Sequence, residues 1–145
     1  ERSIKIQDFF TGVKKTSLKG EEFVKAMEIP NSLEGARGRY LKQQRIRSED
    51  LAIVGVAALV AKDSAGKRQV RIAFSSVAPT PIRIFEVEKF FAKDRPIREL
   101  IDEAVSIVSK KLSPISDVRG SREYRVHLIE VLTRRVLQEL LEEGN

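Results

Sequence analysis

The sequence predicts an α+β fold, in which a small antiparallel β-sheet of three to four strands carries two C-terminal helices packed on one face. Two short apolar segments on either side of the turn-forming string DSAGK predict a β-hairpin. Two amphipathic patterns with apolar residues every three or four positions follow in the last third of the chain and predict the helices. The chain has 145 residues, of which 41% are hydrophobic and 33% charged, as is typical of a single globular domain.

The N-terminal part of the chain predicts one strand before the main sheet. In residues 23–29, the apolar side chains of Phe23, Met27 and Ile29 fall on one side of an extended segment. Pro30 follows directly and ends the segment, because proline has no amide hydrogen to donate to a neighbouring strand.

A basic strand is predicted over residues 37–47. Alternation of side chains places Tyr40 and Lys42 on one face of this strand and a row of arginines on the other. The arginines of this row are Arg37, Arg39, Arg45 and Arg47. Arginine side chains bind phosphates through two parallel hydrogen bonds, so one reading of the chain is a stand-alone interaction domain, or a polyanion or nucleic-acid-binding domain, that uses this row. The net charge of +6 agrees with that reading, but aromatic residues for base stacking are sparse around the row.

The hairpin and the turn after it come next. Residues 51–60 and 69–75 are rich in Val, Ile and Ala and predict its two strands. In the string VAPTPIR, at residues 77–83, Ala78 and Thr80 each precede a proline and are held in extended geometry. The sequence therefore predicts a stiff corner at which the chain leaves the sheet.

The two helices have clear start and stop signals. Pro96 suits the first turn of a helix that runs to about Leu112, before Pro114. Gly120 provides a break, and Ser121 provides an N-cap for the last helix. The apolar stripe of this last helix consists of Leu128, Val131, Leu132, Val136, Leu140 and Leu141.

Composition excludes several kinds of site within this chain. It contains one histidine, His127, and no cysteine, so an ordinary His or Cys metal site and a cysteine nucleophile are excluded. The phosphate-binding patterns GxGxxG and GxxxxGK[ST] and the serine pattern GxSxG are absent as well. No apolar run approaches the length of about 18 to 20 residues that spans a bilayer. The lack of cysteine fits a reducing compartment, and we expect a cytoplasmic protein. Because the chain begins at Glu1 without an initiator methionine, we expect it to be part of a longer protein.

Five separated strings occur in an order that resembles a known family. They are TSLKGEEFVKAMEIP, YLKQQRIRSEDLAIVGVAA, VRIAFSSVAPTPIR, VEKFF and PISDVRGSREYR, at residues 16–30, 40–58, 70–83, 87–91 and 114–125. Together they resemble the C-terminal domain of the FAD-carrying medium subunit of the xanthine dehydrogenase and carbon monoxide dehydrogenase (molybdenum hydroxylase) family.

The resemblance implies a part of an FAD-dependent oxidoreductase complex. In such a complex a large subunit carries the molybdenum cofactor, a small iron-sulfur subunit carries 2Fe-2S clusters, and the flavoprotein subunit passes electrons to an external acceptor. Residues 1–30 resemble the tail of the upstream FAD-binding domain, and residues 31–145 resemble the C-terminal domain itself. The glycine-rich loops that hold FAD in this family lie upstream of the matching region, so the isolated chain is expected to bind FAD weakly or not at all and not to be catalytic.

The resemblance also carries four residues over to the flavin site. Val24 matches an apolar residue that packs near the flavin, and Lys42 matches a lysine that approaches the ring. Arg47 and Asp50 match a charged pair that follows. The chain departs from relatives at Ile46, where a second basic residue is common before Arg47. It departs again at residues 75 and 76, which are serines where relatives often have two glycines.

Overall fold

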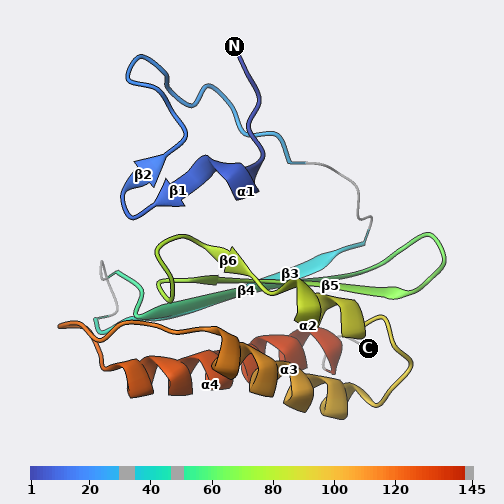
Figure 1. The fold of residues 1–145 in the computed structure, drawn as a ribbon. Helices are drawn as coiled ribbons and strands as arrows, with labels where there is room; N and C mark the ends of the chain where they lie inside the picture. The colour runs from blue at the N-terminus through green and yellow to red at the C-terminus, as the bar shows by residue number, and fades with distance from the viewer. Residues whose placement is uncertain (30–34, 47–50, 143–145) are drawn as a thin grey trace.

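The structure is a computed structural model in which residues 1–29, 35–46 and 51–142 are described. These residues form a four-stranded antiparallel sheet with two long helices on one face, and an N-terminal segment stands on the other side of the sheet (Figure 1). The predicted α+β class, the number of strands and the position of the two C-terminal helices are confirmed.

The sheet has the strand order β3-β4-β5-β6. Its strands are β3 (Arg37–Gln43), β4 (Val54–Lys62), β5 (Arg68–Ser75) and β6 (Ile82–Arg83). The predicted hairpin is β4 and β5, in which Val56 pairs with Phe74, and Leu41 of the basic strand pairs with Val56 on the other side. Because alternate residues face opposite sides, Leu41, Val56 and Phe74 all point toward the helices.

Both helices begin near the predicted positions. Helix α3 (Ile97–Lys111) starts directly after Pro96, and helix α4 (Arg122–Leu141) starts after Ser121. The Ser121 hydroxyl accepts a hydrogen bond from the backbone N–H of Tyr124 at 3.2 Å, which confirms the predicted N-cap. None of the described helices is long and apolar enough to cross a bilayer.

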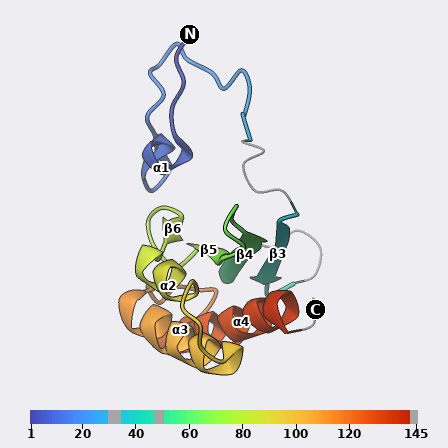
Figure 2. The ribbon, with the colours of Figure 1, turned by 90° about the vertical axis from the view of Figure 1, so that its right-hand side faces the viewer.

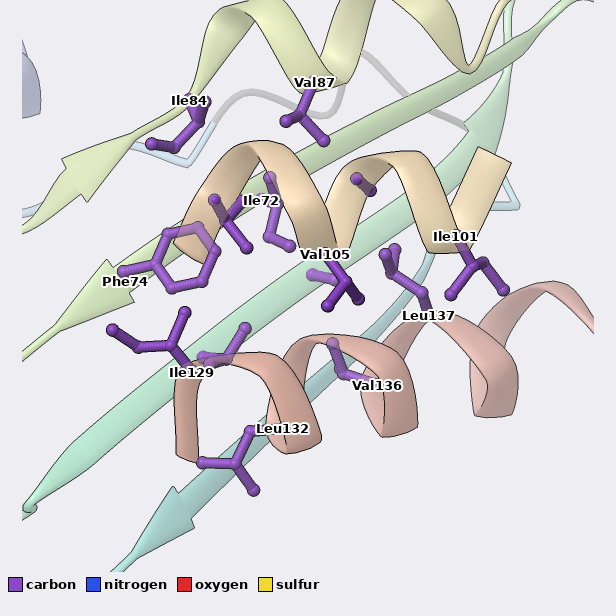
Figure 3. Packing of buried hydrophobic residues seen from close by; sticks show 14 of the residues in the cluster. Ile72, Phe74, Ile84, Val87, Ile101, Val105, Ile129, Leu132, Val136 and Leu137 are labelled. Atoms are coloured by element: carbon purple, nitrogen blue, oxygen red, sulfur yellow. The ribbon is translucent and has the colours of Figure 1, made fainter. Parts of the chain in front are cut away.

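The core lies between the sheet and the two helices. Figure 3 shows Ile72 and Phe74 of β5 pointing toward Ile101 of α3 and Ile129 and Leu137 of α4, and all five side chains are at most 1% exposed. The apolar face of the sheet and the apolar stripes of the two helices therefore pack together in one layer. This packing determines which side chains of each strand in the sheet face the helices and which face away.

The chain leaves β5 through the proline corner as predicted and then forms two short elements that the sequence analysis did not anticipate. These are β6 and helix α2 (Phe85–Phe90). Glu88 of α2 accepts a hydrogen bond from the backbone N–H of Ile72 in β5 at 3.0 Å. The same carboxylate binds Arg83 through two hydrogen bonds of 3.0 and 2.6 Å. A side chain thus satisfies a strand amide at the point where the two-residue strand β6 no longer covers β5.

The N-terminal segment forms its own small unit of α1 (Ile6–Phe9), β1 (Phe10–Gly12) and β2 (Lys15–Thr16). Arg2 closes this unit by binding both carboxylate oxygens of Glu22, at 2.9 and 2.7 Å. These hydrogen bonds lower the pKa of Glu22 to about 2. Figures 1 and 2 both place the unit on the side of the sheet away from α3 and α4.

The predicted strand over residues 23–29 is wrong. Residues 22–29 have no regular secondary structure, and Phe23, Met27 and Ile29 are 81%, 85% and 89% exposed. The alternating pattern is present, but a strand also needs a hydrogen-bonded neighbour, and residues 22–29 have none among the described parts of the chain. Pro30, which was expected to end the strand, lies outside the described residues.

Thr133 of α4 is a site where a substitution is expected to stabilise the protein. Its side chain is fully buried, and its hydroxyl has no hydrogen-bond partner among the described residues. Thr133→Val removes this hydroxyl, keeps the branched shape and is expected to raise the free energy of unfolding by about 1 kcal/mol in urea titrations. Thr133→Ser keeps the hydroxyl, loses a buried methyl group and is expected to lower it by a similar amount. Equal losses in both variants would contradict an unsatisfied hydroxyl at this position.

Candidate functional site

The sheet has one face that neither α3 nor α4 covers, which we call the open face. Its side chains are those one position away from the core-facing residues in each strand. They belong to Gly38, Tyr40 and Lys42 of β3, Gly55, Ala57 and Leu59 of β4, and Arg71, Ala73 and Ser75 of β5. Most of these residues are small, so the middle of the open face is flat.

Gly55 makes room for the side chain of Tyr40 on the open face. A Cβ atom added at Gly55 would lie 2.6 Å from the Tyr40 hydroxyl oxygen and 2.4 Å from Ser75 Oγ. The Tyr40 side chain therefore reaches across β4 toward β5, through the space that the missing side chain leaves. Glycine is required here for close approach, because any larger residue displaces Tyr40 or Ser75.

Lys42 projects from the open face next to this flat surface. It pairs in register with Gly55, which pairs with Ser75 on the next strand. Lys42 is exposed, and no hydrogen bond or ion pair holds its ammonium group within residues 1–29, 35–46 and 51–142. A cation therefore stands beside the Tyr40 ring, which covers Gly55, and is available to a planar or anionic group that lies against this part of the sheet.

Of the other three predicted site residues, the structure describes only Val24. Val24 lies in the irregular part of the N-terminal segment and is 52% exposed. Arg47 and Asp50 lie outside the described residues. Lys42 lies on the face of β3 opposite the core-facing Leu41, and the N-terminal segment, to which Val24 belongs, stands on the same side of the sheet (Figure 1).

The predicted basic strand is shorter than expected, because β3 ends at Gln43: Arg45 lies beyond it and Arg47 lies outside the described residues. The two arginines of the row that lie on β3 face the helices. Arg37 Nη2 donates to the backbone carbonyl of Leu140 at 2.9 Å, and Arg39 Nε donates to Glu139 at 2.8 Å. Both acceptors belong to the last turns of α4. Arg37 and Arg39 thus attach the edge strand to the helix layer, which counts against their use as a phosphate-binding row.

Arg125 is a functional candidate that the sequence analysis missed. It is 2% exposed, and its Nη1 donates to the carbonyls of Ile53 at 2.5 Å and Ser76 at 2.9 Å. Its Nη2 donates to Asp117 Oδ1 at 2.7 Å. These three interactions, which we call the Arg125 clamp, join the start of β4, the end of β5 and the loop before α4. The clamp also connects two of the strings that carry the family resemblance, because Ser76 directly precedes VAPTPIR and Arg125 is the last residue of PISDVRGSREYR.

Local geometry fixes two of the three acceptors of the clamp, Ser76 and Asp117. Ser76 has a φ of 63°, a left-handed conformation that suits glycine better than serine, which explains why relatives often have glycine here. The Asp117 carboxylate accepts from the backbone N–H of Arg119 at 2.8 Å, and this bond, together with the one from Arg125, lowers the pKa of Asp117. Asp117 is therefore held ionised opposite the buried guanidinium.

The described residues offer no group of side chains that could hold a metal ion. No group of three or more His, Asp and Glu side chains gathers among them. Two shallow hollows of about 390 and 370 Å³ flank the exposed His127 on α4, in the helix layer.

Comparison with known proteins identifies the family. Residues 39–140 match the profile of the CO dehydrogenase flavoprotein C-terminal domain. The chain belongs to this family. The resemblance found in the sequence is thereby confirmed.

Relatives of this flavoprotein domain match nearly all of the chain. The xanthine dehydrogenase FAD-binding subunit of Escherichia coli O157:H7 is 33% identical over 140 residues, covering 95% of this chain and 48% of the relative. The glyceraldehyde dehydrogenase medium chain of Sulfolobus acidocaldarius is 33% identical over 139 residues, covering 96% of this chain and 49% of the relative. The chain therefore spans about half the length of these relatives.

A solved structure shares the fold of this flavoprotein domain. Reconstituted CO dehydrogenase from Oligotropha carboxidovorans matches with a TM-score of 0.78 and 28% sequence identity, over 92% of this chain and 46% of that chain. The sheet with its two C-terminal helices is thus the fold of the flavoprotein domain.

Proposed function

We propose that this chain is the C-terminal part of the flavoprotein subunit of a molybdenum hydroxylase, and that its open face forms part of the FAD environment. Residues 1–30 would be the tail of the FAD-binding domain, and residues 31–145 the C-terminal domain. The proposal is supported by membership in the family and by relatives that are named as FAD-binding and medium subunits of dehydrogenases.

The proposed setting is a hetero-oligomeric oxidoreductase. A small subunit with 2Fe-2S clusters and a large subunit with the molybdenum cofactor would be the partners of the flavoprotein subunit. FAD, when bound, accepts electrons from the iron-sulfur clusters and passes them to an external acceptor. The absence of cysteine fits the cytoplasm, which is the compartment we propose.

The observation that carries the proposal is the position of Lys42. Its ammonium group stands on an exposed face next to the Tyr40 side chain, which lies over Gly55 and whose exposed ring offers a flat surface for a planar ring. The residues present therefore fit a flavin. Lys42 would place a positive charge near the edge of the ring that becomes negative on reduction, and so would favour the reduced state.

Three further residues complete the proposed flavin environment. Val24 would supply an apolar contact from the N-terminal segment, which lies on the same side of the sheet as Lys42 (Figure 2). Arg47 and Asp50 follow Lys42 in the sequence and would form a charged pair next to it. The chain itself would supply this wall and a docking surface for its partner subunits, while FAD would be held mainly by the upstream domain.

Lys42→Ala in the FAD-loaded, full-length flavoprotein subunit tests the proposal. Loss of one charge a few ångströms from the ring removes about 1 to 4 kcal/mol of stabilisation from the reduced state. The two-electron flavin reduction potential is therefore expected to fall by roughly 20 to 80 mV in a spectroelectrochemical titration. Lys42→Arg keeps the charge and is expected to retain most of the potential.

Lys67→Ala is the matched control for this experiment. Lys67 is an exposed lysine in the turn between β4 and β5, at the end of the sheet away from Lys42. Its removal changes the net charge equally and is expected to leave the potential unchanged, since distant surface charges are screened by salt. A potential that stays constant in Lys42→Ala with FAD bound would refute the assigned role.

A further inference from the structure

The Arg125 clamp lies at the same end of the sheet as Lys42. Ile53 accepts from Arg125 through its carbonyl, and its own backbone N–H donates to the carbonyl of Gln43 at 2.8 Å. Gln43 directly follows Lys42 in β3. The guanidinium is therefore connected to the backbone next to Lys42 through one residue.

The second carbonyl of the clamp reaches the same row of residues from the other side. Ser76 directly follows Ser75, which pairs with Gly55, which in turn pairs with Lys42. Arg125 thus binds the backbone directly next to Ser75, at one end of the transverse row that Lys42, Gly55 and Ser75 form across three strands, and reaches the residue next to Lys42, at the other end, through Ile53. At this end of the sheet, one buried side chain attaches the start of β4 and the end of β5 to α4, and β3 is linked to it through the Ile53–Gln43 hydrogen bond.

We infer that Arg125 is a positioning residue for Lys42: the clamp holds the start of β4 and the end of β5, and through Ile53 the end of β3, so that the backbone of Lys42 keeps a fixed place from which its side chain extends over the open face. This inference rests on the proposed role of Lys42 near the flavin. Arg125 itself is buried beneath the sheet and does not reach the open face, so any effect of Arg125 on a ligand there passes through the strands.

A double-mutant cycle in the FAD-loaded, full-length flavoprotein subunit tests this inference, with the flavin reduction potential as readout. The cycle compares the unmodified protein, Arg125→Lys, Lys42→Ala and the double variant. Arg125→Lys keeps the charge but loses the planar fork that serves three acceptors at once. We expect Arg125→Lys to lower the potential, in the same direction as Lys42→Ala, and we expect this shift to vanish when Lys42 is already alanine.

The outcomes separate this inference from the proposal on which it rests. If Lys42→Ala leaves the potential unchanged, the proposed role of Lys42 fails, and the inference fails with it. If Lys42→Ala shifts the potential but Arg125→Lys does not, only the inference is overturned. An Arg125→Lys shift of the same size in both backgrounds also overturns it, because Arg125 would then act independently of Lys42.

One further variant tests whether a general loss of stability causes the change in reduction potential, and another can replace Arg125→Lys in the cycle. Val136→Ala opens a cavity in α4 about three helical turns beyond Arg125, and is expected to lower the unfolding temperature without moving the potential. If Arg125→Lys does not retain FAD, Asp117→Asn takes its place in the cycle. It removes the anionic partner of the guanidinium, leaves both strand carbonyls bound, and is expected to give a smaller shift that also requires Lys42.

Discussion

Arg125→Ala is expected to lower the free energy of unfolding by about 3 to 5 kcal/mol, the largest loss among the substitutions proposed for this chain. The substitution removes the three hydrogen bonds that the charged guanidinium donates. The carbonyls of Ile53 and Ser76 are then left without this donor. Each buried polar group that loses its partner costs about 1 to 3 kcal/mol. The truncated side chain also leaves a space beneath the sheet that the packed core does not fill.

Urea titration of the chain, followed by far-ultraviolet circular dichroism, measures this loss. Arg119→Ala is the matched control, because Arg119 belongs to the same string and its partly exposed guanidinium approaches Asp117 only at 3.9 Å, while the backbone N–H that binds Asp117 is kept in alanine. Its removal is expected to change the stability by less than about 0.5 kcal/mol. Similar losses in both variants would mean that the clamp contributes no more than a surface ion pair.

Glu88→Ala is expected to lower the free energy of unfolding by about 2 to 3 kcal/mol. The Glu88 carboxylate is the acceptor for the backbone N–H of Ile72, which β6 is too short to cover, and for two donors of Arg83. Alanine leaves the strand amide without an acceptor and the arginine without its anion. The side chain of Glu88 is only 11% exposed, so water replaces these bonds incompletely.

Glu88→Gln separates the two parts of this effect. Glutamine still offers an oxygen to the Ile72 amide but no charge to Arg83, so it is expected to lose less than half as much stability as alanine. Glu86→Ala serves as the control on the same helix, because Glu86 is exposed and pairs only with Lys111 among the described residues. If glutamine proves as destabilising as alanine, the ion pair with Arg83, and not the strand amide, accounts for the stability.

The parts of the fold that the sequence predicted are those that local chemistry determines. The β4–β5 hairpin follows from two apolar runs around a glycine-containing turn, and α4 begins at Ser121 because a serine hydroxyl satisfies its first free amides. The strand expected over residues 23–29 failed because its existence depends on a partner that alternation does not specify. Strand β6 and helix α2 are too short for either periodicity to be visible.

In the candidate site too, the sequence predicted what local alternation determines and missed what depends on distant contacts. The face of Lys42 was predicted correctly, because alternation along β3 sets it opposite Leu41, which packs against the core. Arg125 was missed, although the sequence carries a signal for it. It precedes the buried Leu128 and Ile129 by three and four positions and thus continues the apolar stripe of α4. A charged residue at a core position requires buried partners, but their identity depends on contacts 49 and 72 residues away.

Those long separations affect how the protein is made. A chain grows from its N-terminus at about 5 to 20 residues per second, so Arg125 leaves the ribosome roughly 2 to 10 seconds after Ser76, and later still after Ile53. During this interval β4 and β5 can pair, but the end of the sheet next to Lys42 has no guanidinium to hold it, and its apolar underside awaits α4. The newly synthesised β4–β5 hairpin therefore exposes an unpaired apolar face until α4 has been made, and its final shape depends on a helix that is synthesised later.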